Sequence, residues 1–544
     1  MFKPEIINSL KNYSKKQFFN DLIAGAIVSI VALPLSIAFA IASGVGPERG
    51  IFTAIIGGFI ISALGGSKVQ IGGPTGAFIV MVYGIMQQYG YNGLVIATIL
   101  SGIILIILGA CNLGTLVRYI PYTIITGFTL SIAVTIFTTQ IGDFLGLTTP
   151  KLPADFLGKL ITYGKHLDTF NVISFAIAAI SLTIIFLWPK VSKKIPGAVI
   201  VIVLMTVICQ VFNIPVDTIG SRFGEMPRFL PPPTIPHVNL QLIQELFPSA
   251  LSLAILGAII SLSCAVVTDG MTASKHDSNT ELIADGIANI GCGIFGGIPV
   301  TGAIARTIAN IKNGGRTPIA GIVHAICLLL IMVLLGKYAV FIPMPALSAV
   351  LISAAWNMCN FKAIKGLFQG QKSDTTVFLV TLFTTLLVNL TTAILVGLLI
   401  AAFFFIKKIV DLTVFQEHTK GEPDTGNDFS GLAVPENALV YEINGALFFG
   451  TINKFEQALE RTNQTYNALI LIMKNTIYLD AGGIQVLEKL FDSCKKKKVT
   501  LILSNVHTQP LLLLHKSGLD ETIGQENIFG DITIALEHAR KINN

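Results

Sequence analysis

The residues best suited to bind a ligand occur in two short, similar stretches of a largely apolar sequence. The first is VQIGGPTGAFIVM (69–81) and the second is GGIPVTGAIARTI (296–308). In each, glycine and proline interrupt the apolar run before a Thr-Gly-Ala sequence from which a helix can start. The free N–H groups at a helix start, together with the positive end of the helix dipole, bind anions. The two stretches therefore predict a polar cradle for a negative ion, to which Arg306 adds a full positive charge.

Each of these features also has a purely structural interpretation. A glycine-proline pair in a membrane helix is often only a kink, and a lone arginine can extend its side chain to the interface. The repetition of the pair favours a site, and ionisable residues inside a membrane are functional by default. No metal-ligand cluster and no pair of nucleophile and base can be assembled from the sequence. We therefore expect no enzymatic activity, no catalytic residues, no metal and no cofactor.

The composition is that of a polytopic membrane protein. Of 544 residues, 52% are hydrophobic and 12% are charged, whereas soluble domains carry about 25% charged residues. The mean hydropathy is +0.72. Residues 22–46 and 247–268 contain no charged side chain, and about 20 apolar residues suffice for a helix to cross a membrane. The net charge is +6. Because the basic residues flank such segments, they indicate membrane topology and not a nucleic-acid partner.

The apolar pattern predicts about fourteen helical segments, several of them too short to span a membrane alone. Their cores are 22–43, 50–65, 75–89, 93–111, 117–140, 171–188, 196–212, 247–268, 280–293, 302–312, 318–337, 341–357, 375–391 and 393–406. Basic residues follow the sixth, tenth, twelfth and fourteenth segments: Lys190, Lys193, Lys194, Lys312, Arg316, Lys362, Lys365, Lys407 and Lys408. Since basic residues favour the cytoplasmic side, both termini are predicted to be cytoplasmic and the loop 213–246 external.

The transmembrane part contains an internal repeat. AGAIVSI (24–30) and LGAIISL (256–262) match almost residue for residue, and a Thr-Gly-Ala sequence follows each at a similar distance. Two halves of seven segments follow, at about 21–213 and 247–408. Because seven is odd, the second half enters the membrane inverted, which is typical of secondary transporters. The two helix starts would then face each other near the midplane, where interrupted backbone is tolerated only if it lines a cavity.

The character of the chain changes after Lys408. We predict a cytoplasmic N-terminal segment (1–20), a transmembrane domain (21–410), a polar linker (411–434) and a second domain (435–544). In the last of these, strand-like runs such as ALVYEING alternate with helical runs such as INKFEQALERTN. Alternating strands and helices predict a small α/β domain.

These motifs resemble the SulP sulfate-permease family, the bacterial relatives of animal anion exchangers and of prestin. The resemblance rests on ALPLSIAFAIASG, GGPTGAF, the run AVVTDGMTASKHDSNTELIADGIANIGCGIFGGIPVTGAIARTIANIKNGGRTPIAG and the STAS-like C-terminal domain. It implies a homodimer in the bacterial inner membrane, with gate and core domains, and an anion held between the third and tenth helices. The substrate-binding positions that it implies are Phe39, Thr75, Gly76, Ala77, Gly302, Ala303, Ala305 and Arg306.

The chain departs from the family pattern where relatives carry coupling carboxylates. Leu35 follows Pro34 where proton-coupled relatives have glutamate, and Ile260 replaces an acid of the eighth span, with Cys264 one turn on. A buried Na⁺ site needs oxygen ligands, so exchange or uncoupled flow becomes plausible. Asp285 is a candidate substitute proton or cation site, although an acid at such a position more often caps or pairs within the core domain.

Several questions of function stay open from the sequence. Sulfate, bicarbonate, chloride and dicarboxylates all suit a dipole-lined site with one arginine. The leading hypothesis is a secondary anion transporter that works by an elevator-like movement; a channel-like conductor and a STAS-linked membrane sensor are the alternatives. The expected partners are the anion, membrane lipid, a second copy of the chain and a cytoplasmic partner of the STAS domain. Asp480-Ala481-Gly482-Gly483 lacks the serine that related STAS domains phosphorylate, so that switch is not expected.

Overall fold

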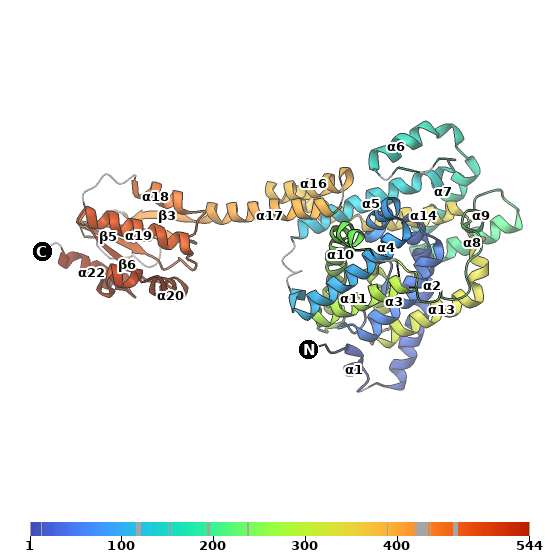
Figure 1. Ribbon diagram of the computed structural model, residues 1–544, viewed down its shortest axis with the longest axis horizontal. Coiled ribbons are helices and arrows are strands. Elements are labelled where there is room, and N and C mark those ends of the chain that lie inside the picture. The colour runs from blue at the N-terminus through green and yellow to red at the C-terminus, as the bar shows by residue number, and fades with distance from the viewer. Residues whose placement is uncertain are drawn as a thin grey trace. The chain divides into compact units, whose positions relative to one another are not determined.

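The predicted apolar segments form helices in the computed structural model (Figure 1). The model describes residues 2–11, 13–115, 121–150, 152–153, 155–192, 196–234, 236, 239–388, 390–418, 434–435, 437–460 and 466–542. The chain divides into two units, Met1–Leu399 and Ile400–Asn544, each of which is described by itself. This division falls inside helix α17, whereas the sequence-based boundary after residue 410 stays a prediction.

The first unit is helical. Its helices are α1 (Glu5–Ser9), α2 (Lys15–Ala42), α3 (Pro47–Leu64), η1 (Gly76–Phe78), α4 (Ile79–Ala110), α5 (Tyr122–Leu145), α6 (Phe156–Lys165), η3 (Leu167–Thr169), α7 (Val172–Leu187), η4 (Trp188–Lys190), α8 (Gly197–Val211), α9 (Ile219–Phe223), α10 (Leu240–Thr272), α11 (Ser278–Ile294), α12 (Ile304–Lys312), α13 (Ile319–Ala339), α14 (Met344–Met358), α15 (Phe361–Gln369), α16 (Lys372–Leu387) and α17 (Leu390–Leu412). Nine helices of the described residues are long and apolar enough to cross a membrane. The fold is therefore that of a polytopic membrane protein.

Each of the fourteen predicted segments coincides with a helix or with half of one. The third and fourth segments lie in the single element α4, which is broken at Gly90 by a backbone conformation of φ 65° and ψ −168°. The start of the fifth predicted segment and two of the predicted basic residues, Lys193 and Lys194, lie outside the described residues. The sequence analysis did not anticipate the short helices α6, α9 and α15, which are too short to give a membrane-spanning signal.

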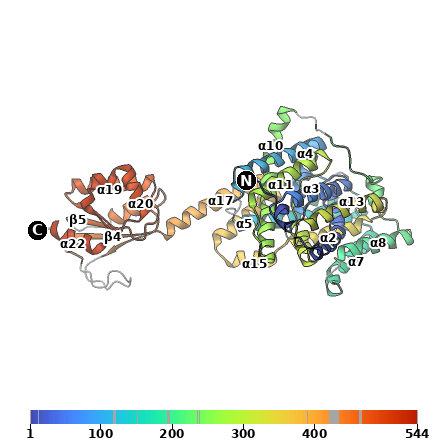
Figure 2. The same cartoon turned by 90° about the horizontal axis from the view of Figure 1, so that it is seen from below.

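The long helices pack in two groups. In the first group, α4 packs on α10 and α11, α3 packs on α11, and α13 packs on α2 and α3; Figure 2 shows α3, α4 and α11 together. In the second group, α5 packs on α14 and α16, and α7 packs on α14 and α8. We call these the first and second helix groups. They match the two-domain arrangement expected from the resemblance.

Glycines allow close backbone approach within the first helix group. A Cβ atom on Gly102 of α4 would lie 2.5 Å from the carbonyl oxygen of Gly286 of α11, and a Cβ on Gly286 would lie 2.5 Å from that of Gly102. Small residues that let two backbones meet in this way are the usual means of helix association in membranes. The first helix group is therefore held by direct backbone contact.

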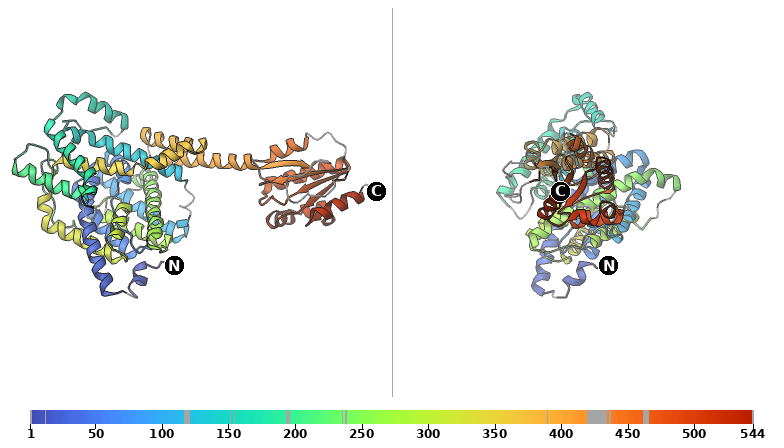
Figure 3. Two further views of the ribbon diagram at one scale, coloured as in Figure 1. Left: turned by 180° about the vertical axis from the view of Figure 1, so that it is seen from behind. Right: turned by 90° about the vertical axis from the view of Figure 1, so that its left-hand side faces the viewer.

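The second unit is a five-stranded sheet with helices on both faces (Figure 3). Its elements after α17 are β3 (Val414–His418), β4 (Ala438–Asn444), α18 (Ile452–Glu460), β5 (Ala468–Ile472), α19 (Ala481–Lys496), β6 (Thr500–Ser504), α20 (Thr508–Ser517), α21 (Leu519–Ile523), η5 (Gln525–Asn527), β7 (Ile528–Phe529) and α22 (Ile532–Ile542). The strand order is β3-β4-β5-β6-β7, in which only β3 is antiparallel to its neighbour. This confirms the predicted α/β domain.

Alternation along the central strand explains the two covered faces. Leu469 and Leu471 of β5 pack in one apolar core with α18, α19 and α20, and Ile470 and Ile472 pack in another with α22. Successive side chains of a strand point to opposite faces, so a strand that is buried on both faces carries an unbroken apolar run. The ALILI sequence of β5 is such a run.

Candidate anion-binding site

The two glycine-rich breaks pair with each other. Residues 72–73 form strand β1 and residues 301–302 form strand β2, which lie antiparallel with Gly72 opposite Gly302 and Gly73 opposite Thr301. The amide of Ala303 then donates to the carbonyl of Ile71 at 2.8 Å. The chain enters a helix directly after each strand. Because the strands are antiparallel, η1–α4 and α12 leave this point in opposite directions with their amino ends together.

The two helix starts differ in how their amides are satisfied. Thr75 is the N-cap of η1, and its Oγ1 accepts from the amide of Ala77 at 3.0 Å. Ala303 is the N-cap of α12 and has no side chain that can accept, so no side chain caps that helix. The first amides of an uncapped helix need another acceptor. The start of α12 therefore presents donors that a bound anion can satisfy.

Arg306 reaches from one break to the other. It is the third residue of α12, and its Nη2 donates to Ser36 Oγ of α2 at 3.0 Å and to the carbonyl of Pro74 at 3.3 Å. Its Nη1 lies where a Cβ on Gly73 would stand. The side chain is 2% exposed, and Nη1 has no hydrogen-bond partner in the part of the chain that is described. One donor of a buried guanidinium is thus left free beside the paired breaks.

The structure also brings Phe39 to the first helix start. Phe39 Cε1 lies 3.4 Å from the position of a Cβ on Gly76, and side-chain atoms of Ile136 and Met358 lie 3.3 Å from it. Phe39 belongs to α2, whereas Ile136 and Met358 belong to α5 and α14 of the second helix group. The site therefore lies where the two helix groups meet.

The remaining predicted residues divide into an accessible surface and a buried support. Ala305 is exposed, Thr75 is half-buried, and Ala77 and Ala303 each keep 9% of their surface. Gly302 is buried against the side chain of Gln70. The structure thus assembles all eight predicted positions around the paired breaks. Arg306 lies buried beneath the accessible surface.

Sequence reasoning missed several residues that support this arrangement. Besides Ser36, Thr307 accepts from the amide of Ile71 at 3.0 Å and donates to the carbonyl of Ala303 at 2.9 Å, so it ties α12 to the first break. Cys264 Sγ donates to Thr307 Oγ1 at 3.4 Å. The position of Thr307 next to Arg306 was the sequence signal, because the pairs Thr307–Ile71 and Ser36–Arg306 each join residues more than two hundred positions apart.

A buried carboxylate holds the chain that leads into β1. Glu281 of α11 is fully buried, and its Oε2 accepts from the amides of Gly66 and Ser67 at 2.7 and 3.0 Å. Its Oε1 accepts from Gln70 Nε2 at 2.7 Å. Three donors on one carboxylate compensate for its burial. Glu281 therefore fixes the approach to the first break and does not face the anion site.

Asp285, one turn beyond Glu281 on α11, has a different environment. It is fully buried, and neither carboxyl oxygen has a hydrogen-bond partner among the described residues. It neither caps a helix nor forms an ion pair there, in contrast to the structural interpretation of this acid.

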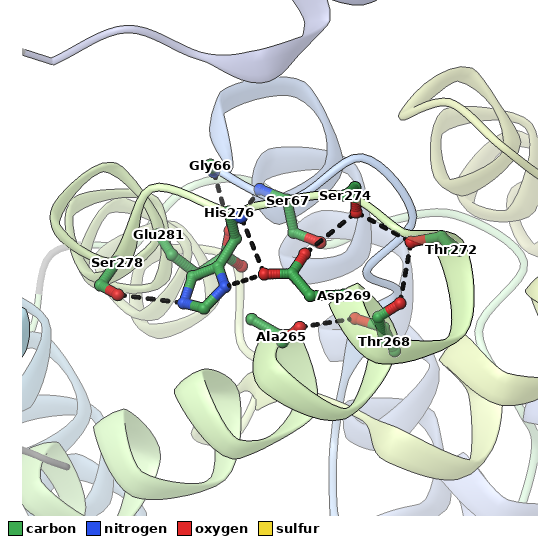
Figure 4. Close-up of polar contacts among 10 residues, drawn as sticks. All are labelled: Gly66, Ser67, Ala265, Thr268, Asp269, Thr272, Ser274, His276, Ser278 and Glu281. Carbon is green, nitrogen blue, oxygen red and sulfur yellow. Dashed lines mark hydrogen bonds and ion pairs between the residues drawn. The ribbon is translucent and has the colours of Figure 1, made fainter.

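A polar cluster stabilises the turn between α10 and α11 (Figure 4). Asp269 Oδ2 contacts His276 Nδ1 at 2.7 Å, and His276 Nε2 contacts Ser278 Oγ at 3.0 Å. This is the contact order of a serine-histidine-aspartate triad, which the sequence did not reveal. However, Asp269 also accepts from the amide of His276 and from Ser274 Oγ, and His276 is only 8% exposed. The cluster closes on its own loop and leads into the helix that carries Glu281.

Comparisons with known proteins agree with these features. Residues 18–381 match the sulfate permease family and residues 432–535 match the STAS domain. The chain is 40% identical to the putative sulfate transporter YvdB of Bacillus subtilis over 522 residues, which cover 95% of this chain and 97% of that protein. It is 29% identical to the bicarbonate transporter BicA of Picosynechococcus over 449 residues, 79% of this chain and 78% of that protein.

Solved structures share the fold. The murine anion transporter Slc26a9 in its inward-facing state matches 99% of this chain and 94% of its own with a TM-score of 0.89 at 21% identity. The transmembrane domain of a cyanobacterial BicA matches 72% of this chain and 98% of its own with a TM-score of 0.63 at 28% identity. The similarity covers both the helical unit and the sheet unit of this chain.

Proposed function

The chain belongs to the sulfate permease family, and from this premise we propose that it carries small anions between the starts of η1–α4 and α12. Like its relatives, it is a multi-pass membrane anion transporter and not an enzyme. The proposed substrate contacts are Phe39, Thr75, Gly76, Ala77, Gly302, Ala303, Ala305 and Arg306. We place it in the bacterial inner membrane as a homodimer with both termini in the cytoplasm.

The pairing of the two breaks is the observation that carries this proposal. Each helix start contributes about half a positive charge, and Arg306 contributes a whole one. The guanidinium is bound to neutral oxygens of Ser36 and Pro74, so these contacts leave its charge uncompensated. An uncompensated buried charge is unfavourable, and an anion at the accessible surface above it would relieve that cost.

An elevator-like movement follows from where the site lies. Phe39 belongs to α2 of the first helix group, and the paired breaks and α12, which carries Arg306, pack on α2, α3 and α10 of that group. Ile136 and Met358 belong to the second group. Sliding of the first group past the second would carry the anion with it and exchange only the contacts made by α5 and α14. Rigid-body movement of one bundle against the other is the usual route to alternating access.

Ala305 offers a direct test of the binding site, because its side chain is exposed at the uncapped start of α12. Cys111 is the exposed native cysteine among the described residues, so the background is Cys111→Ser. In that background we expect a negatively charged thiol reagent to label Ala305→Cys, and sulfate or bicarbonate to slow the labelling. A cysteine at the exposed Gly270 of α10 should label at a rate that neither anion changes. Equal anion protection at both positions, or at neither, would contradict the site.

Coupling is the second part of the proposal. Moving one charge through 100 mV costs about 2.3 kcal/mol, so uptake of a dianion into a negative-inside cell is opposed by about 4.6 kcal/mol, or over 10³-fold in concentration. Leu35 and Ile260 supply no carboxylate. We therefore propose exchange of anions or uncoupled flow, with Asp285 as the candidate site if protons or cations do contribute.

Reconstitution into liposomes under separate Na⁺, H⁺ and trans-anion gradients distinguishes these modes. We expect a trans-anion gradient to accelerate uptake and a Na⁺ gradient to leave it unchanged; clear Na⁺-driven uptake would refute the exchange mode. If a proton gradient drives uptake, Asp285→Asn should abolish that drive and preserve anion exchange. The same vesicles, tested with competing sulfate, bicarbonate, chloride and dicarboxylates, identify the substrate.

A further inference from the structure

A second polar space lies away from the paired breaks, on the predicted external side. It is a cavity of about 700 Å³ bordered by the ends of α2 and α5, by α4, α6, α7 and α9, and by the start of α14. Four charged residues line it: Asp143, Lys159, Asp217 and Arg222. Their pairing decides what the cavity can bind.

Three of the four charges are bound to one another. Arg222 Nη1 lies 2.6 Å from Asp143 Oδ1, and its Nη2 lies 3.0 Å from Asp217 Oδ2. One guanidinium thus occupies both carboxylates of the cavity. A bidentate or bridging arginine of this kind has little capacity left for a further anion.

Lys159 is the unbalanced charge. It is only 3% exposed, and no carboxylate oxygen of the described chain lies within ion-pair distance of its ammonium group. Its Nζ instead lies over the ring of Tyr83, 4.7 Å from the centroid. Asp155, one turn earlier on α6, uses its carboxylate to cap the helix by accepting from the amide of Gly158. Burial lowers the pKa of Lys159, and the charge of Asp155 opposes this shift.

Tyr83 is held so that its ring faces the lysine. Its hydroxyl donates to the carbonyl of Leu152 at 3.1 Å, which fixes the ring plane against the loop before α6. A cation over a tyrosine face gains less free energy than a buried ammonium without a counter-charge loses. An anion in the cavity would therefore stabilise the ammonium group of Lys159.

The cavity also shares two helices with the anion site. Tyr83 follows Thr75 by eight residues on η1–α4, which is about 12 Å along a helix. Ile41 and Ala42, which also line the cavity, follow Phe39 on α2. The two helices that supply Phe39 and Thr75 thus continue into the wall of this cavity.

We propose that Lys159 and Tyr83 form an entry site, at which a small oxyanion or carboxylate binds before it reaches the paired breaks. The proposal rests on the proposed transport function for its purpose, but the binding itself does not. Lysine suits such a role because its ammonium is a compact charge with three donors that holds an anion without a fixed fork geometry.

Equilibrium dialysis of the purified full-length protein with radiolabelled sulfate tests the entry site. We expect wild type to bind sulfate at two sites and Arg306→Gln to retain one. Adding Lys159→Gln to Arg306→Gln should weaken the residual binding at least about fivefold, the equivalent of about 1 kcal/mol, whereas adding Lys159→Arg should preserve it. Lys165→Gln, at the exposed end of the same helix, should leave it unchanged. Lys159→Met keeps the stem that covers Tyr83 and so separates loss of charge from loss of packing.

The outcomes separate the two proposals. Residual binding of the same strength in Arg306→Gln with and without Lys159→Gln would overturn the entry site, and so would its absence from Arg306→Gln when wild type binds one sulfate. Residual binding that depends on Lys159, in a protein whose wild type transports no anion in liposomes, would support the entry site and overturn the proposed transport.

Discussion

The two breaks are near-copies in sequence, yet they contribute different things to the site. The first break supplies a capped helix start and a carbonyl, since Thr75 accepts from Ala77 and Pro74 accepts from Arg306. The second supplies an uncapped start and the only full charge at the pair. The two breaks therefore share a backbone conformation but differ in a few side chains. The first break mainly supplies hydrogen-bond acceptors, and the second mainly supplies donors. Substitutions in the two breaks should have unequal effects.

Removal of the charge should have the largest effect. We expect Arg306→Gln to reduce anion flux in liposomes by about 30-fold or more, because truncation of one member of a buried charge pair costs about 2–5 kcal/mol. Arg228→Gln, an exposed change in the predicted external loop, should leave flux near wild type. An Arg306→Gln protein that elutes normally on gel filtration and transports at the wild-type rate would remove the charge from the mechanism.

The next effect should come from the neighbour that makes room for the guanidinium. A Cβ on Gly73 would collide with Arg306 Nη1, and overpacking costs about 1–3 kcal/mol. We therefore expect Gly73→Ala to lower flux about tenfold. Gly84→Ala is the matched control, because a Cβ there meets nothing within 4 Å. Equal flux in the two variants would show that the position of the guanidinium does not matter.

Loss of the cap should be milder. Thr75→Ala removes the acceptor for the Ala77 amide, which costs about 1 kcal/mol, and we expect about a fivefold rise in the half-saturating anion concentration. Thr75→Ser keeps the acceptor and should be close to wild type. If both variants behave alike, the hydroxyl at the first break has no part in binding.

Ser36→Ala should have the smallest effect. It removes one acceptor from Arg306 Nη2, which keeps the carbonyl of Pro74, so we expect the lower part of the range of about 0.5–1.5 kcal/mol for a net hydrogen bond. We expect about a threefold decrease in flux and a small fall in melting temperature. A decrease as large as that of Arg306→Gln would show that Ser36 contacts the anion itself.

The local sequence pattern was sufficient to predict the helical segments, the sheet unit and the two glycine-rich breaks. Apolar runs bounded by basic residues predicted the fourteen helical segments, and the repeated Thr-Gly-Ala sequence predicted the helix starts. The strand-helix alternation after the linker predicted the sheet unit, although most of that linker lies outside the described residues. These features depend on neighbouring residues, and so they can be read from the chain directly.

The long-range partners could not be predicted in the same way. Nothing near Arg306 indicates that it reaches Ser36, which is 270 residues away, or that β1 and β2 pair. Nor does the sequence distinguish Glu281, whose carboxylate accepts three hydrogen bonds, from Asp285, whose carboxylate accepts none from the described residues, since both acids lie in one helix. The sequence also gives no sign that Lys159 is buried, because its burial depends on how α6 packs.

The antiparallel ladder between residues 72–73 and 301–302 has a consequence for where the protein can open. It joins the two inverted repeats through backbone hydrogen bonds. The side chain of Arg306 joins them a second time, because it donates to Ser36 and to the carbonyl of Pro74. Under the proposed movement, access therefore alternates at the border of this pair of breaks with α5 and α14 and not at the boundary between the repeats. The solute would then move together with β1, β2 and Arg306 and would exchange only the wall formed by Ile136 and Met358.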